Sequence, residues 1–526
     1  MTAATTGAAG RVPTRRRRRR ITRLLVAALV LVIAGVGVLA LAWSRASTDT
    51  TGRVIFDRPL AIPPLAPSRS ESGTRVFDLR AGAGTTDFGV GDGVTRTWGF
   101  DGAYLGPTLR AERGERVRVD VTNDLGESTT VHWHGHELPA EMDGGPHQAI
   151  EPGQTWSPTW TIDQPAATTW YHPHPHGRTA EHVHRGLAGM FLVDDDDSRT
   201  LDLPSEYGVD DIPVIVQDKA FTADGQFDHR SGPFSPTGVL GDTVLVNGTI
   251  GPYLEVDRDK VRLRLLNASG ARIYDFGLVD DHGHDREFAV IAGDGGLLPS
   301  PVTADRIRLS PGERAEIVVG LQPGRDVVLR SHPTDLGADF WNQRFSGGDD
   351  RLDVLQLRAA DRLVPGPDLP GDLGPPPDLD PADAGVTRAF RLGGTSINGL
   401  DMDVRRIDHV GTAGETELWE VTNAGGTPHD FHVHGVRFVV ADVDGRRPPP
   451  PLRGWKDTVY VAPGTTVRLV LRLPRHADPD SPYMFHCHLL QHEDRGMMGQ
   501  FLVIEPGQEP GRPPAAGHDA HALTQG

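Results

Sequence analysis

Short stretches in which polar and apolar residues alternate recur along most of this 526-residue chain. Residues 116–121 (RVRVDV) and 467–472 (VRLVLR) are clear examples, and each follows a turn that contains glycine. Because successive side chains of a strand point to opposite faces, this alternation predicts strands with one buried face. The same turn recurs at residues 309–314 and 151–154, which suggests internally related domains. No long amphipathic helical pattern competes with this β prediction.

Length and composition divide this β protein into domains. The chain is too long for a single core, and 63 glycines with 43 prolines suit sandwiches or barrels built from short strands. An acidic run ends a first domain, and a segment rich in proline and aspartate is interpreted as a linker. The strand pattern is lost after Glu505. The predicted divisions are domain 1 (52–200), domain 2 (201–362), a linker (363–385), domain 3 (386–507) and a disordered tail (508–526).

The first 43 residues follow a different pattern. Residues 1–23 are basic, with six consecutive arginines, and residues 24–43 form an uncharged apolar run. Such a run is long enough to cross a membrane as a helix, and the positive charge before it predicts a cytoplasmic N-terminus. Ala40-Leu41-Ala42 resembles a signal-peptidase site, so a cleaved export signal is the alternative to an anchor. Both alternatives place the rest of the chain outside the cytoplasmic membrane, anchored or secreted.

The only cysteine of the chain lies in the segment HCHLLQHEDRGM, residues 486–497. Cysteine, histidine and a weak axial methionine are the ligands of a blue-copper site. In an extended strand Cys487 would face one way, while His486 and His488 would face the other. Three consecutive residues could therefore serve one copper on one side and a copper cluster on the other. Copper ligation would also explain a lone cysteine in an exported chain, where no internal disulfide can form.

Three further histidine groups match this segment. They are His132 and His134, His172 and His174, and a set of three that is formed by His429, His432 and His434. A His-x-His sequence on a strand puts two imidazoles on one face, and imidazole is a good copper ligand. A single pair more often binds nothing. Four groups from two distant regions, one of them around the only cysteine, predict a metal centre.

These motifs resemble those of the multicopper oxidase family. HWHG, WYHPHPHG, HxxHxH and HCHLLQHEDRGMM are similar to its four copper-binding motifs, in order and complete. The resemblance continues through residues 104–108, 143–145, 186–189 and 214–219, and covers residues 53–505. It is greatest to the bacterial three-domain branch, which includes cuprous oxidases, spore-coat laccases and bilirubin oxidases.

The resemblance implies an all-β fold of three cupredoxin-like Greek-key β-sandwich domains, which follow the N-terminal hydrophobic helix. It implies four coppers per chain. Since the histidine motifs lie in domains 1 and 3, domain 2 is interpreted as a spacer. The implied ligands are, for type 1 copper, His429, Cys487, His492 and Met497; for type 2 copper, His132 and His432; and for the type 3 pair, His134, His172, His174, His434, His486 and His488.

The implied reaction is the four-electron reduction of O2 to water, which needs protons near the cluster. The resemblance places Asp143 and Glu493 in proton delivery. Asp143 could instead be a structural acid in a turn, and Glu493 could orient its neighbouring ligand. The remaining histidines near the motifs are expected to be structural, and those of the tail inert: His136, His147, His176, His182, His184, His518 and His521.

The motifs do not identify the reductant of this reaction. Cuprous oxidases of this branch carry a methionine-rich insertion, whereas this chain has seven methionines in all and none in the linker before domain 3. This favours a laccase-like enzyme acting on phenols or aromatic amines. A metal oxidase acting on Cu(I), Fe(II) or Mn(II) is the alternative, and a non-catalytic copper-binding scaffold is a remote one. The net charge is −18, and a monomer with no nucleic-acid partner is expected. The length and the complete ligand set exclude a two-domain nitrite reductase.

Overall fold

The computed structural model describes residues 15–91, 93–232 and 234–513, and the chain forms two compact units, residues 1–47 and 48–526. The first contains helix α1 (Arg15–Arg45), in which residues 18–45 are long and apolar enough to cross a membrane. The predicted N-terminal helix is thus confirmed, and it continues through Ala42. His518, His521 and the start of the predicted basic region lie outside the described residues.

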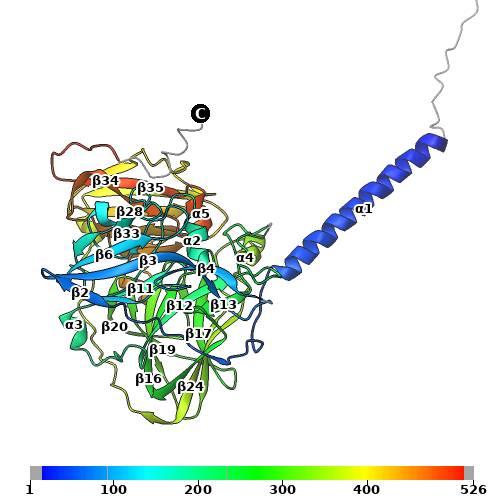
Figure 1. Ribbon diagram of the computed structural model, residues 1–526. Helices are drawn as coiled ribbons and strands as arrows, with labels where there is room; N and C mark the ends of the chain where they lie inside the picture. Colours follow the sequence, from blue (N-terminus) through cyan, green and yellow to red (C-terminus); the bar gives the residue numbers. More distant parts are fainter. Residues whose placement is uncertain (1–14, 92, 233, 514–526) are drawn as a thin grey trace, which may run out of the picture. The chain divides into compact units, whose positions relative to one another are not determined.

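The first β-sandwich of the larger unit is coloured blue to cyan in Figure 1. Phe77 and Val119 from one sheet pack with Trp133 and Phe191 from the other. The larger sheet contains β2 (Ser68–Glu71), β3 (Thr74–Thr86), β4 (Thr95–Phe100), β6 (Arg116–Asn123), β8 (Thr155–Trp156) and β9 (Thr159–Thr161). The smaller contains β5 (Leu109–Glu112), β7 (His132–His134), β10 (Ala167–His172) and β11 (Gly189–Asp194).

The second sandwich includes a strand from the start of the larger unit. Arg58 and Pro59 of β1 pair in parallel with Pro252 and Tyr253 of β15. The predicted domain 1 therefore begins with residues that join the second sandwich. One sheet contains β1 (Arg58–Pro59), β15 (Pro252–Arg258), β17 (Tyr274–Asp280), β18 (Asp285–Arg286), β21 (Ile307–Leu309), β23 (Asp326–Ser331) and β24 (Leu352–Val364). The other contains β12 (Asp211–Lys219), β13 (Thr243–Val246), β14 (Thr249–Ile250), β16 (Lys260–Asn267), β19 (Phe288–Gly293), β20 (Gly296–Ala304) and β22 (Arg314–Gly320).

The third sandwich has a core that includes Cys487 and Met497 with Trp419 and Phe501. One sheet contains β25 (Val386–Gly393), β26 (Ser396–Ile397), β28 (Thr416–Asn423), β30 (Phe438–Val443), β31 (Trp455–Lys456) and β33 (Thr466–Arg472). The other contains β27 (His409–Thr412), β29 (His429–Val433), β32 (Thr458–Val461), β34 (Asp478–His486) and β35 (Met498–Ile504).

Short helices connect the sandwiches. The amides of Thr179 and Ala180, at the start of α2, donate to the Asp494 carboxylate of α5 at 2.8 and 3.0 Å. This contact ties the first sandwich to the segment that carries His492. The short helices are α2 (Thr179–Arg185), α3 (Asp196–Arg199), α4 (Phe340–Phe345), α5 (Leu490–Asp494), η1 (Ala140–Met142), η2 (Pro381–Asp383) and η3 (Pro450–Arg453).

The alternating segments are strands, as predicted. The side chains of β6 alternate between buried and more exposed positions, and β33 covers the second predicted segment. The turn glycines Gly114, Gly312 and Gly464 have φ of 89°, 83° and 74°. This left-handed conformation favours glycine, which explains the recurrent turn before each strand. The all-β prediction is confirmed.

Candidate metal centre

A small cluster of one sulfur and two imidazoles lies in the core of the third sandwich. His429 begins β29, Cys487 follows β34, and His492 belongs to α5. Cys487 Sγ lies 3.6 Å from His429 Nδ1 and 3.7 Å from His492 Nδ1, and these two nitrogens are 3.1 Å apart. Met497 is buried in the same core, and its carbonyl accepts the Cys487 N–H at 3.1 Å. The structure therefore brings all four predicted type 1 residues into one core.

The surroundings of Cys487 favour a bound cation. Burial, together with the neighbouring Asp430 carboxylate, raises the pKa of the Cys487 thiol well above its usual value. A thiolate at this position needs a compensating positive charge, and a metal ion supplies one. The residues present thus fit a metal of the soft type that binds sulfur and imidazole.

The outer edge of His492 faces the second sandwich. Its Nε2–H donates to the Pro236 carbonyl at 2.7 Å, which leaves Nδ1 as the nitrogen directed at Cys487. The ring is buried, so this contact fixes its orientation.

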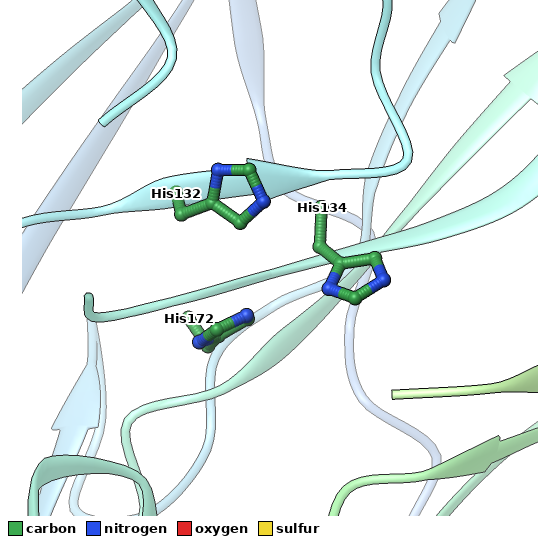
Figure 2. Close-up of side chains that lie close together, drawn as sticks. All are labelled: His132, His134 and His172. Carbon is green, nitrogen blue, oxygen red and sulfur yellow. The ribbon is translucent and has the colours of Figure 1, made fainter. Parts of the chain in front are cut away.

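A second cluster contains eight histidines, four from each outer sandwich. His132 and His134 lie on β7, and the ring centroids of His132 and His434 are 3.8 Å apart, while those of His134 and His432 are 3.7 Å apart. Figure 2 shows the rings of His132, His134 and His172, each of which offers a nitrogen within 4.8 Å of the others. All eight rings are buried: His132, His134, His172, His174, His432, His434, His486 and His488.

In six of these rings one nitrogen donates to a protein oxygen at 2.6–3.1 Å. A neutral imidazole has a single N–H, so the other nitrogen carries a bare lone pair. Four of those six rings leave that nitrogen buried without a protein partner: His132 Nε2, His134 Nδ1, His172 Nε2 and His432 Nε2. Such a set of buried lone pairs is suited to metal coordination.

The other two bare nitrogens, those of His434 and His486, face each other, and His174 lies beside them. His486 Nε2 lies 3.0 Å from His434 Nε2 and 3.2 Å from His174 Nε2. Burial lowers the pKa of His486 to about 3, which opposes a shared proton. Lone pairs this close repel one another unless a cation lies between them, so this group also fits a metal.

The two clusters are joined through three consecutive residues. Cys487 belongs to the small cluster, whereas His486 and His488 on either side belong to the large one. In the structure Cys487 therefore points towards the small cluster, while His486 and His488 point towards the large one. A covalent path of a few bonds connects the two clusters.

Both predicted acids touch the histidine cluster. Asp143 Oδ2 accepts from His434 Nδ1 at 2.6 Å, and its carbonyl accepts from His132 Nδ1 at 2.9 Å. The Glu493 carboxylate oxygens lie 3.5 Å from His174 Nε2 and 3.4 Å from His486 Nδ1. Burial raises the pKa of Glu493 well above its usual value.

Two other acids at the clusters were missed by the sequence analysis. Asp457 Oδ1 accepts from His134 Nε2 at 3.0 Å, and Asp430 Oδ1 accepts from the His488 N–H at 2.5 Å and lies 3.3 Å from Cys487 Sγ. Asp430 could have been noticed, because it is a charged residue inside the third motif. Asp457 follows Trp455-Lys456 far from any motif, with no local signal.

The remaining histidines near the motifs lie outside these clusters. His136 contacts Thr169, His147 contacts Gln500, and His182 lies between Thr129 and Glu127, each at 2.9–3.0 Å. The ring centroids of His184 and His229 are 4.8 Å apart, and both residues line a cavity of about 360 Å³ that also contacts Gln491 and Asp494 of α5.

Comparison with known proteins gives two matches to sequence profiles described as multicopper oxidase, at residues 84–198 and 374–507. The multicopper oxidase Mco of Staphylococcus haemolyticus is 35% identical over 84% of this chain and 92% of its own length. Cell division protein FtsP of Salmonella typhimurium is 40% identical over 85% of this chain and 93% of its own.

A solved structure gives a similar result. The laccase-like multicopper oxidase of Ochrobactrum sp., described as active towards lignin model compounds and lignosulfonate, aligns with a TM-score of 0.76. The two sequences are 34% identical, and the alignment covers 85% of this chain and all of the other.

Proposed function

This chain belongs to the multicopper oxidase family, with its cupredoxin-like fold, and we propose that it is a laccase-like member. The family's copper oxidoreductases use O2 and a reductant. In this proposal the reductant is a phenol or aromatic amine, which gives up electrons one at a time. The observation that carries the proposal is the convergence of the histidines and the only cysteine in two buried clusters joined at Cys487.

The proposed ligands follow the four motifs. Type 1 copper would be held by His429, Cys487, His492 and Met497, and type 2 copper by His132 and His432. The type 3 pair would be held by His134, His172, His174, His434, His486 and His488, for four coppers in all. When bound, copper would supply one-electron acceptance at the small cluster and multi-electron chemistry towards O2 at the large one.

The protein's own residues orient and enclose these sites. Asp143 holds the ring of His434 through its 2.6 Å hydrogen bond, and the buried rings exclude bulk water. Second-sphere bonds of this kind fix the tautomer and direction of a ligand. Asp143 and Glu493 are the proposed proton carriers, because they are the two predicted acids in contact with the cluster.

The cavity beside α5 supports an organic donor. It has a volume of about 360 Å³, and its lining residues come from all three sandwiches. Gln491, next to His492, is among them, so a donor bound there would be close to the type 1 site. None of the described residues that line it is methionine, the side chain that Cu(I) prefers. The described activity of the Ochrobactrum relative on lignin compounds is in the same class.

A metal-ion reductant is the second candidate. The His184 and His229 rings in the same cavity are 4.8 Å apart, and paired imidazoles can bind Cu(I) or Fe(II). A scaffold without catalysis is a third, since relatives named for cell division are 40% identical to this chain. The complete set of histidines favours catalysis over a scaffold.

We also propose that the enzyme is an exported monomer. Helix α1 would anchor it on the outer side of the cytoplasmic membrane, or would be cleaved near Ala42. In this proposal the domains are residues 52–200, 201–362 and 386–507, with residues 363–385 as the linker, although β1 of the first domain pairs with a strand of the second sandwich.

Oxygen uptake tests the proposal. Full-length protein in detergent is loaded with copper, and uptake is compared with a phenol and with Cu(I) as donor. Faster uptake with the phenol, abolished in Cys487→Ser, is the expected result. A preference for Cu(I) would favour the metal oxidase, and full copper loading without uptake from any donor would favour the scaffold.

A further inference from the structure

The second sandwich, which supplies no histidine to the large cluster, nevertheless touches it. The turn between β21 and β22 places Gly312 against the rings of His134 and His488. A Cβ atom at Gly312 would lie 3.0 Å from His488 Cδ2 and 3.1 Å from His134 Cε1, closer than ordinary contacts allow. One ring comes from each outer sandwich, so this turn forms a wall of the cluster.

Arg314, two residues further on, is fully buried and uses all its donors. Its Nε donates to the Thr168 carbonyl at 3.0 Å, and its two terminal nitrogens donate to the Gly312 and Asp294 carbonyls at 3.0 and 2.9 Å. The remaining two N–H groups bind both oxygens of Asp457, at 2.7 and 2.6 Å. A guanidinium has five N–H donors, and here all five are satisfied. One side chain thus connects the three sandwiches.

Asp457 in turn forms hydrogen bonds with two histidines of the large cluster. Its Oδ1 accepts from His134 Nε2 at 3.0 Å, and its carbonyl accepts from His432 Nδ1 at 2.9 Å. These bonds leave His134 Nδ1 and His432 Nε2 as the free nitrogens. The Asp457 carboxylate therefore decides which nitrogen of His134 is offered to a metal, and the Asp457 backbone carbonyl does the same for His432.

A second group of buried charges, formed by Lys456, Glu313 and Asp294, holds the turn in position. Lys456 Nζ lies 2.7 Å from Glu313 Oε1 and 2.9 Å from Asp294 Oδ2. Glu313 Oε2 accepts from the Ser310 N–H at 2.7 Å, and Asp294 Oδ1 accepts from the Arg314 N–H at 2.7 Å. Since Lys456 precedes Asp457, the second and third sandwiches are held together directly beside the cluster.

We propose that the turn at residues 310–314 is a positioning element of the copper cluster, with Gly312 making room for His134 and His488 and Arg314 holding Asp457 against His134. The second sandwich is then part of the metal centre, and the interpretation of it as a spacer is replaced. This inference rests on the proposed ligand roles of these histidines.

The test measures copper rather than turnover. Gly312→Ala is compared with Gly283→Ala, which has the same φ of 83° but no atom within 4 Å of an added Cβ. Copper per chain, the type 2 electron paramagnetic resonance signal and the near-ultraviolet band of the type 3 pair report on the large cluster. The blue thiolate-to-copper band reports on the small one.

Gly312→Ala should keep the blue band and lose type 2 and type 3 signals, with cluster affinity weakened roughly ten- to hundredfold, as for other second-sphere changes. Gly283→Ala should retain both. Arg314→Met should behave as Gly312→Ala does, whereas Arg272→Met removes an equally buried arginine bound to Asp218 and Asp350 and should spare the cluster signals. If Arg314→Met does not fold, the comparison of Gly312→Ala with Gly283→Ala still tests the inference.

Full cluster occupancy and unchanged signals in Gly312→Ala would overturn the inference, as would equal losses in both glycine variants. An unmodified protein that binds no copper would instead overturn the proposed function, and this inference with it.

Discussion

Substitutions of Asp143 distinguish two proposed roles of its carboxylate, which are the orientation of His434 and the delivery of protons. Its Oδ2 accepts from His434 Nδ1 at 2.6 Å, and both side chains are buried. In Asp143→Ala the His434 N–H loses its acceptor away from water, which costs about 1.5–3 kcal/mol for a bond to a charged group. Since 1.4 kcal/mol is a factor of ten, copper affinity of the large cluster should fall roughly ten- to hundredfold.

Asp143→Asn keeps an acceptor oxygen for His434 but cannot carry a proton. We expect this variant to retain its copper while turnover falls roughly a hundredfold or more, the usual contribution of a positioned proton donor. Copper retention is measured by competition with a chelator, and turnover by oxygen uptake at saturating phenol.

Asp211→Asn is the matched control, because Asp211 is equally buried but pairs with Arg264 away from the histidines. Unchanged turnover in Asp143→Asn would refute a role in proton delivery. Unchanged copper affinity in Asp143→Ala would refute the orienting role.

Three further predictions concern other residues. Cys487→Ser should remove the blue band and one copper per chain while the histidine cluster keeps its copper; elemental analysis that finds no loss would contradict the assignment. Asp430→Ala removes the acceptor of the His488 N–H and a carboxylate 3.3 Å from Cys487 Sγ, so the energy of the blue band should shift, and Asp430→Asn should restore part of the shift. Burial lowers the pKa of Lys219 from 10.5 to about 7, so the unfolded chain binds one more proton between these values. Stability should therefore rise with pH over this window, by a few kcal/mol at most, and Lys219→Met should flatten the rise in denaturant titrations; an unchanged slope would contradict it.

Local patterns were sufficient for much of the fold. The alternation at β6 and β33 depends only on the two-residue period of a strand, and the glycine turns depend on a backbone conformation that other residues avoid. The apolar run that became α1 likewise needs no partner to be recognised. The candidate ligands were also found locally, because histidines two residues apart on a strand share a face, and the resemblance to a known family assigned them to sites.

Other features depend on contacts between distant parts of the chain. Strand β1 joins the second sandwich because its partner Pro252 lies almost two hundred residues further on, which no local pattern indicates. Arg314 and Asp457 are likewise far apart in sequence, and each alone is an ordinary charged residue that would be assigned to the surface. They form an ion pair because both are buried, and a buried charge is costly unless a charge of opposite sign lies beside it.

The sequence by itself therefore determined the class of fold, the apolar N-terminal helix and the candidate ligands, because each is encoded in neighbouring residues. Only the tertiary structure decided which nitrogen each histidine keeps free, which acids orient the rings, and that the second sandwich completes the wall of the cluster. The physical reason is that His134 and His434 are oriented by carboxylates of another sandwich, Asp457 and Asp143, which reach these rings only when the sandwiches pack together.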